Sequence, residues 1–160
     1  MNVVQPQTAS PKVLPEKIHI VRIAMVRGHL DTTEEFLARP VQPKHIKVDF
    51  GHRSSINWRS KTIYTRLFVE LEAQDEKDKP IGVNAAYAFD FDIMVENLKD
   101  YEAKMPDGSK LHGVMGATLM GIIFSTARGM VLERTKGTYL EGVILPVITP
   151  RDLLVSQRTA

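Results

Sequence analysis

The sequence predicts an α+β fold in a single domain, from three observations. The middle of the 160-residue chain contains segments in which apolar and polar residues alternate, as they do in half-buried strands. A polar stretch rich in turn formers separates two of these segments. After them comes one long apolar segment with a turn before it and a glycine after it, which is typical of a core helix.

Three strands follow from the alternation. The apolar sets are Ile46, Val48 and Phe50 in residues 45–50, then Ile63, Leu67, Val69 and Leu71 in residues 62–73, and Ile81, Val83, Tyr87, Phe89, Phe91 and Ile93 in residues 81–93. Residues 74–80 (QDEKDKP) form the hairpin loop between the last two strands. Keeping both apolar sets on one face places Arg66 near Ala88 and Asp90. The opposite face then carries many carboxylates, including Glu70 and Glu72.

The N-terminal part is less regular. Residues 17–30 (KIHIVRIAMVRGHL) are β-branched and apolar on both faces, which predicts a strand buried on two sides, with a helix as the alternative. Residues 1–16 contain three prolines and are expected to form a flexible arm. The predicted domain therefore spans residues 17–155, and residues 156–160 form a short tail.

The long helix carries an unusual number of small residues. Its expected limits are a cap at Ser109 and a C-terminal glycine at Gly137. Its apolar residues go most of the way round, which indicates two covered faces. Small residues recur every four positions, at Gly113, Ala117, Gly121, Ser125 and Gly129. Each helical glycine costs up to ~1 kcal/mol relative to alanine, so this small-residue ridge packs either inside the monomer or against a second copy of the helix.

Composition excludes several classes of function. The chain has no cysteine, which removes disulfides, thiolate nucleophiles and cysteine zinc sites, and a reducing cytoplasmic location fits. The histidines lack zinc-ligand spacing, and no cofactor is expected. The net charge of +2 gives no support for nucleic-acid binding, in spite of Arg53, Arg59 and Lys61 around Trp58. The longest uncharged run, residues 111–127, is shorter than the roughly 20 residues of a membrane span.

The C-terminal half resembles SecB, the bacterial export chaperone, and its SecB-like relatives. The likeness is carried by Gly116, Ile123, Phe124, Ala127, Arg128, Arg134, Gly137, Thr138, Leu145, Pro146, Val147 and Leu153. The resemblance implies a four-stranded antiparallel sheet, one long helix and a short C-terminal helix, assembled as a dimer of dimers. It also implies an apolar groove that holds unfolded or pre-secretory polypeptides without ATP, in agreement with the absence of a P-loop motif.

The same resemblance indicates where the groove lies. Residues 35–45 (EFLARPVQPKH) occupy the place of the crossover loop of the family, which makes Phe36, Leu37 and Val41 candidate lining residues. The C-terminal apolar segment supplies the other candidates, Ile144, Leu145, Val147, Leu153 and Leu154. Clients of such a groove would be recognised by apolar surface alone.

The chain departs from the family at its end. SecB proteins commonly close on a polar tail with cysteine and histidine ligands that binds zinc and the translocation ATPase SecA, and the tail VSQRTA has none of these ligands. The sequence therefore does not decide whether SecA is a partner. The alternative is a SecB-like chaperone dedicated to the antitoxin of a toxin–antitoxin system.

An enzyme of the hot-dog thioesterase type is the alternative from another class. Residues 111–120 (LHGVMGATLM) resemble the His-Gly-Gly entrance to the central helix of those enzymes, in which the helix N-terminus polarises a thioester carbonyl. Here Val114 replaces the second glycine, and Glu133 is the first carboxylate on the helix. No residue is therefore assigned a catalytic role.

Overall fold

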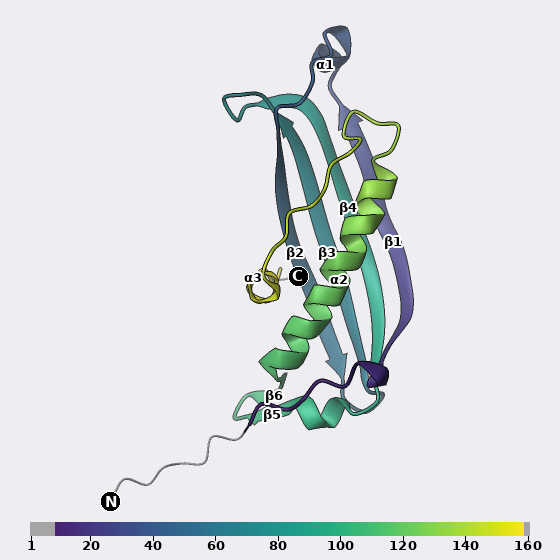
Figure 1. The fold of residues 1–160 in the computed structure, drawn as a ribbon, viewed down its shortest axis with the longest axis vertical. Coiled ribbons are helices and arrows are strands. Elements are labelled where there is room, and N and C mark those ends of the chain that lie inside the picture. The colour runs from purple at the N-terminus through teal and green to yellow at the C-terminus, as the bar shows by residue number, and fades with distance from the viewer. Residues whose placement is uncertain (1–8, 159–160) are drawn as a thin grey trace, which may run out of the picture.

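The four long strands form one antiparallel sheet. The computed structural model of the protein describes residues 9–158. The strands are β1 (Ile18–Thr32), β2 (His45–Asn57), β3 (Thr62–Gln74) and β4 (Pro80–Val95), in the spatial order β1-β4-β3-β2. Because β1 and β2 lie at opposite edges, residues 33–44 cross the full width of the sheet (Figure 1).

One long helix, α2 (Gly113–Arg134), crosses a single face of the sheet obliquely (Figure 1). We call the face under α2 the inner face. The smaller elements are η1 (Pro15–Lys17), α1 (Glu34–Ala38), η2 (Leu98–Tyr101), β5 (Glu102–Met105), β6 (Gly108–Leu111) and α3 (Pro150–Val155). The predicted α+β fold, with a four-stranded antiparallel sheet, one long helix and a short C-terminal helix, is confirmed. The helix α1 and the β5–β6 hairpin were not predicted.

The helix starts later than predicted. Ser109 lies in β6, and the N-cap is His112, whose Nδ1 accepts a hydrogen bond from the backbone N–H of Val114 at 3.2 Å. The last helical residue is Arg134, and Gly137 takes a positive φ of 73° three residues later. By length and composition α2 could cross a membrane, a property that core helices of soluble proteins share, and here it packs on the sheet.

The predicted register of the central strands is confirmed. Leu67 of β3 lies opposite Phe89 of β4, and Val69 lies opposite both Phe50 and Tyr87. The inner face therefore collects the apolar side chains of three strands, and α2 adds Met115, Leu119, Ile123, Ala127 and Val131 to the same core. Fully burying one large apolar side chain contributes about 1.5–3 kcal/mol, so a register slip of one residue would cost most of the core.

The outer face of the sheet is held by ion pairs. Arg66 donates two hydrogen bonds to the largely buried carboxylate of Asp90, at 2.6 and 2.9 Å, and Arg22 donates to Asp92 at 2.7 Å. The hydrogen bonds from Arg66 lower the pKa of Asp90 below its usual value, although burial acts in the opposite direction. Arg158 pairs with Glu70 at 3.4 Å. The carboxylates expected to make this face acidic are therefore partly neutralised.

The strand β1 corrects one prediction. It is a strand and not a helix, but it lies at a sheet edge and is not buried on two sides. Val21 is 65% exposed, and Ile20, Ile23 and Val26 are also exposed. The register shifts between Ile20 and Arg22 and again between Met25 and Arg27, so each of the two bulges leaves an extra apolar residue unpaired. The apolar residues on both faces of β1 therefore result from two bulges in an edge strand, and not from burial on both sides.

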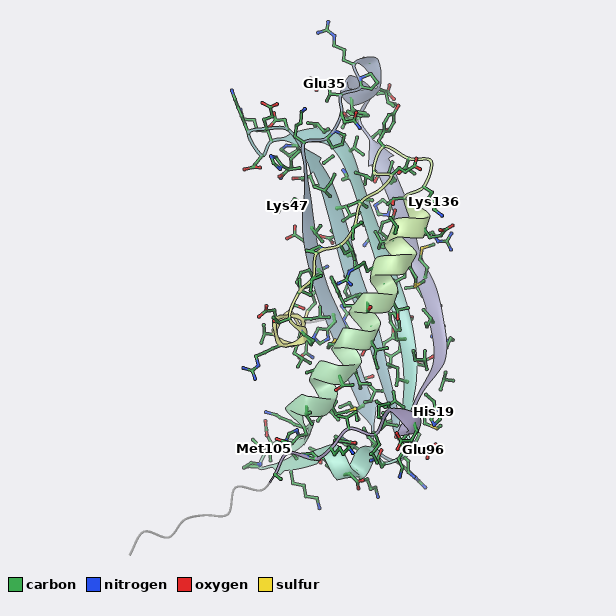
Figure 2. All side chains as sticks on the ribbon, in the orientation of Figure 1. His19, Glu35, Lys47, Glu96, Met105 and Lys136 are labelled. Atoms are coloured by element: carbon green, nitrogen blue, oxygen red, sulfur yellow. The ribbon has the colours of Figure 1, made fainter. Side chains whose placement is uncertain are left out.

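The ordered packing extends beyond the predicted domain limits. Residues 1–8 of the predicted arm and residues 159–160 of the tail lie outside the described residues. Within the arm, the hydroxyl of Tyr101 donates to the carbonyl of Lys12 at 2.8 Å. Within the tail, Arg158 donates its backbone N–H to the carbonyl of His52 at 2.7 Å. Figure 2 shows Glu35 of α1 and Met105 of β5 at opposite ends of the molecule.

We expect Asp90→Asn to lower the free energy of unfolding at pH 7 by about 2 kcal/mol, because Arg66 loses its charged acceptor. The lowered pKa of Asp90 gives stability that is present above the ordinary value of 3.8 and is lost as the pH falls through the folded-state value. The difference between wild type and variant should therefore shrink below about pH 4. Urea unfolding from pH 7 to pH 2 measures it, with the exposed Asp107→Asn as control. A difference that stays constant with pH would show that the ion pair contributes nothing.

Candidate functional site

The crossover connection begins with a short helix that is anchored to the start of β4. The backbone N–H of Thr33 donates to the carbonyl of Gly82 at 2.9 Å, and the Thr33 hydroxyl accepts from the N–H of Phe36 at 3.2 Å. Gly82 has a φ of +94° and packs against Thr33, so a side chain there would displace the cap of α1. The crossover therefore has a fixed starting geometry.

Phe36 faces inward from α1. It is 3% exposed, and its ring meets that of Tyr139 edge to face, with centroids 4.8 Å apart. Leu37 and Val41, on the same connection, are exposed. The crossover is thus pinned by one aromatic side chain while its other apolar residues face solvent.

The segment after α2 returns along the inner face of the sheet. We call residues 143–149 the strap; they contain no helix or strand and run toward α3, which lies beside β2 (Figure 1). Arg128 of α2 holds the strap, since its Nε donates to the carbonyl of Leu145 at 3.1 Å and its Nη2 to the carbonyl of Pro146 at 3.3 Å. The same guanidinium lies 5.6 Å from the ring centre of Phe124. These contacts fix the orientation of the strap.

The eight candidate groove residues divide into two groups. Phe36, Leu145 and Leu153 are 3% exposed or less and belong to the core, which corrects the expectation that they line an open groove. Leu37, Val41, Ile144 and Val147 are exposed, the last two by 66% and 88%, and Leu154 is half-buried. The buried side chains fix the backbone from which the exposed ones project. Sequence spacing alone did not separate the two groups, because the strap has no periodicity.

Two shallow cavities lie along the crossover connection. One, of ≈ 490 Å³, lies between the crossover and the start of β4, and the other, of ≈ 420 Å³, lies between the crossover prolines and the loop after α2. Val41 lines both. We call the exposed residues Leu37, Val41, Tyr139, Ile144 and Val147 the crossover–strap surface.

The small-residue ridge of α2 is mostly open. A Cβ added at Gly113 or Gly129 would have no neighbour within 4 Å, and one at Gly121 would touch only Pro150, at 3.7 Å. Ser125 is exposed and Ala117 half-buried. Packing inside the monomer therefore accounts for the contact at Gly121 and leaves both ends of the ridge uncovered by the described residues.

In the part of the chain that the structure describes, the two residues of the thioesterase alternative do not come together. His112 uses Nδ1 to cap α2, and Glu133 lies at the far end of the same 22-residue helix, where it pairs with Lys136 at 2.6 Å. Among residues 9–158, no group of three or more His, Asp or Glu side chains has metal-binding geometry. Trp58, between the basic residues Arg53 and Lys61, is half-buried and packs against the core.

We expect Arg128→Ala to loosen the strap, because two charge-assisted hydrogen bonds to its carbonyls are lost. The free energy of unfolding should fall by about 2 kcal/mol, and thermolysin should cleave within residues 143–149 under native conditions. Arg128→Lys should give an intermediate result, since an ammonium cannot donate as a planar fork. Arg59→Ala, an exposed arginine in the β2–β3 turn, serves as control. If strap cleavage stays at the wild-type rate, the burial of Leu145 alone holds the strap.

Comparisons with known proteins give a fold likeness. No family model matches the chain, and no curated protein matches it. Among solved structures, the Rv1957 SecB-like chaperone of Mycobacterium tuberculosis, in complex with a peptide from the HigA1 antitoxin, aligns with a TM-score of 0.54 and 13% identity, over 84% of this chain and 92% of that one. A protein of unknown function from Streptococcus agalactiae aligns with a TM-score of 0.43 and 10% identity, over 81% and 97%. The chain has a SecB-like fold.

Proposed function

We propose that this chain is an ATP-independent chaperone that holds unfolded polypeptides on its crossover–strap surface. The observation that carries the proposal is the exposure of Ile144 and Val147 on a backbone that Arg128 and the buried Leu145 hold in place. A soluble protein that fixes apolar side chains in water keeps a surface ready for an apolar partner. The SecB-like fold supports the same proposal.

The apolar chemistry of this surface suits an unfolded polypeptide as its partner. Apolar burial is non-directional, so many weak contacts can accept different sequences, and a folded client with no exposed core would not bind. No nucleotide step is required, because binding and release follow the folding of the client. The protein would act in the cytoplasm, on clients before export or assembly.

A second candidate function is the holding of one dedicated client, an antitoxin. The likeness to a SecB-like chaperone that was solved with an antitoxin peptide favours it. A dedicated chaperone should protect one partner at far lower concentration than unrelated unfolded proteins.

The proposed working form is a homo-oligomer assembled through the open small-residue ridge. Small residues let two helices approach closely, and this packing would offset the helix propensity lost at the glycines. The exposed edge of β1, with Val21 and Val26, would supply a second contact, since an unprotected apolar edge strand is an aggregation hazard. Two distinct contacts of this kind build a dimer of dimers.

We expect a variant with serine at Leu37, Val41, Ile144 and Val147 to lose most of its ability to delay aggregation of a denatured client. The four side chains are exposed, so stability should change by less than about 0.5 kcal/mol. A matched variant, Leu37→Met, Val41→Ile, Ile144→Val and Val147→Ile, should protect like wild type because apolarity is retained. Light scattering of several chemically denatured clients measures the effect. Full protection by the serine variant would show that clients bind elsewhere.

We expect Gly129→Leu to dissociate the oligomer, because the new side chain would separate two helices that meet at the ridge. Within one subunit it meets open space and improves helix propensity by about 0.8 kcal/mol, so the fold should survive. Ser125→Ala keeps the ridge smooth and is the control. Light scattering at micromolar concentration gives the molar mass. A wild-type monomer, or an unchanged mass for Gly129→Leu, would remove the ridge interface.

A further inference from the structure

The chain adds its own C-terminal segment to the free edge of β2. The backbone N–H of His52 donates to the carbonyl of Ser156 at 3.3 Å, and the N–H of Arg158 donates to the carbonyl of His52 at 2.7 Å. His52 and Gln157 thus form a parallel bridge. The edge of β2 therefore accepts an extended peptide segment, and residues 156–158 are its present occupant.

The same segment places a side chain in a cleft on the inner face. Leu154 lies against Gly116 of α2, where an added Cβ would meet Leu154 Cδ2 at 3.3 Å. His52 Nε2 donates to the carbonyl of Leu154 at 3.1 Å, and its Nδ1 forms a hydrogen bond with the Ser54 hydroxyl, 3.0 Å away. Beyond Leu154 the cleft has a volume of ≈ 480 Å³, with apolar walls from Ile56, Trp58, Leu111, Leu119 and Met120. We call it the β2 cleft.

Most of the edge beside this cleft is unpaired. Backbone groups alternate in direction along a strand, so those of Ser54 and Ile56 point to the same side as those of His52. Neither residue makes a backbone hydrogen bond on that side with any part of residues 9–158. Unpaired groups of this kind are a template for a further strand.

Residues 156–158 make few contacts with β2, and their position depends on Gly51. A Cβ at Gly51 would lie 2.5 Å from Arg158 Nε, 2.9 Å from Arg158 Cγ and 3.0 Å from the carbonyl oxygen of Ser156. Apart from the single bridge, the Arg158 guanidinium lies 5.0 Å from the ring centre of Phe68, and its Nη1 lies 3.4 Å from Glu70 Oε1. Both contacts lie on the outer face of the sheet. Residues 156–158 can therefore leave the edge without opening the core.

From these contacts we propose that an extended apolar segment of a client binds the edge of β2 in place of residues 156–158 and puts a large apolar side chain into the β2 cleft. The inference rests on the proposed chaperone function. It adds that clients bind through backbone hydrogen bonds to the edge of β2. A peptide is favoured over a second copy of β2, because α3 lies beside β2 and would obstruct a long strand. The tail then acts as a competitor that lowers client affinity by the fraction of time it is bound.

Two variants of the full chain should act in opposite directions. Arg158→Ala removes the contacts of the tail with Phe68 and Glu70, leaves the edge of β2 unchanged, and should raise affinity for the client at least threefold. Ser54→Pro removes one edge N–H without touching the bonds to β3 and should lower affinity about three- to tenfold. Ser54→Ala keeps the N–H and controls for loss of the hydroxyl. Circular dichroism and urea unfolding check that each variant is folded.

The probe is a labelled synthetic peptide with the sequence of residues 150–160, measured by fluorescence anisotropy. A second peptide, N-methylated at the position of Arg158, cannot donate to His52 and should bind at least tenfold more weakly. An excess of the first peptide should also displace an unfolded client and restore its aggregation. Equal binding of the two peptides, or affinity that falls in both Arg158→Ala and Ser54→Pro, would overturn the edge site.

The outcomes separate this inference from the proposed function. If wild type delays client aggregation but the peptide and both variants leave protection unchanged, the edge site is wrong and the chaperone function stands. If wild type protects no client, both are wrong. If Arg158→Ala dimerises without binding the peptide more tightly, the freed edge pairs with a second copy and the inference fails.

Discussion

A single helix has to cover a sheet that is larger than itself, and the rest of the structure follows from this mismatch. The 22 residues of α2 give a rod of about 33 Å in length and about 10 Å in diameter. Strands of 13 to 16 residues are about 42–54 Å long, and four of them span about 14 Å between the outer axes. Laid diagonally, the helix leaves two opposite corners of the inner face without cover.

The two corners are treated differently. The strap and α3 cover the corner over β2 and β3. They bury only some of their apolar side chains. Leu145 and Leu153 enter the core, while Ile144 and Val147 stay exposed. Near the start of β1 nothing in residues 9–158 closes the corner, and Ile20 and Ile23 remain exposed. The exposed apolar residues are thus a product of geometry. A protein could remove them by substitution, and their presence is the reason to assign them a use.

How far the sequence predicts this structure depends on the period of each segment. The alternation in β2, β3 and β4 fixed both the strand type and the inner face, down to the pairing of Arg66 with Asp90, because a period of two admits one register. β1 was misjudged because two bulges interrupt its period, which makes an exposed edge resemble a doubly buried strand. The strap has no period, so only the structure could assign Leu145 to the core and Val147 to solvent. The cap at His112 was missed because histidine is an uncommon N-cap, and Ser109 offered a better-known one.

The glycines of α2 also divide by position, and this division bears on how the surface works. Gly116 is explained inside the subunit, because Leu154 of the tail occupies the space that a side chain would fill. Gly113 and Gly129 have no such neighbour among the described residues, and the proposed helix contact between subunits would offset their cost in helix propensity. Gly51 belongs with Gly116, since both make room for the last turn of α3 and the residues after it. Two glycines on different elements therefore keep a place on β2 for one extended segment. That segment is short and partly exposed, and under the proposal above a longer apolar chain would replace it by making the same hydrogen bonds.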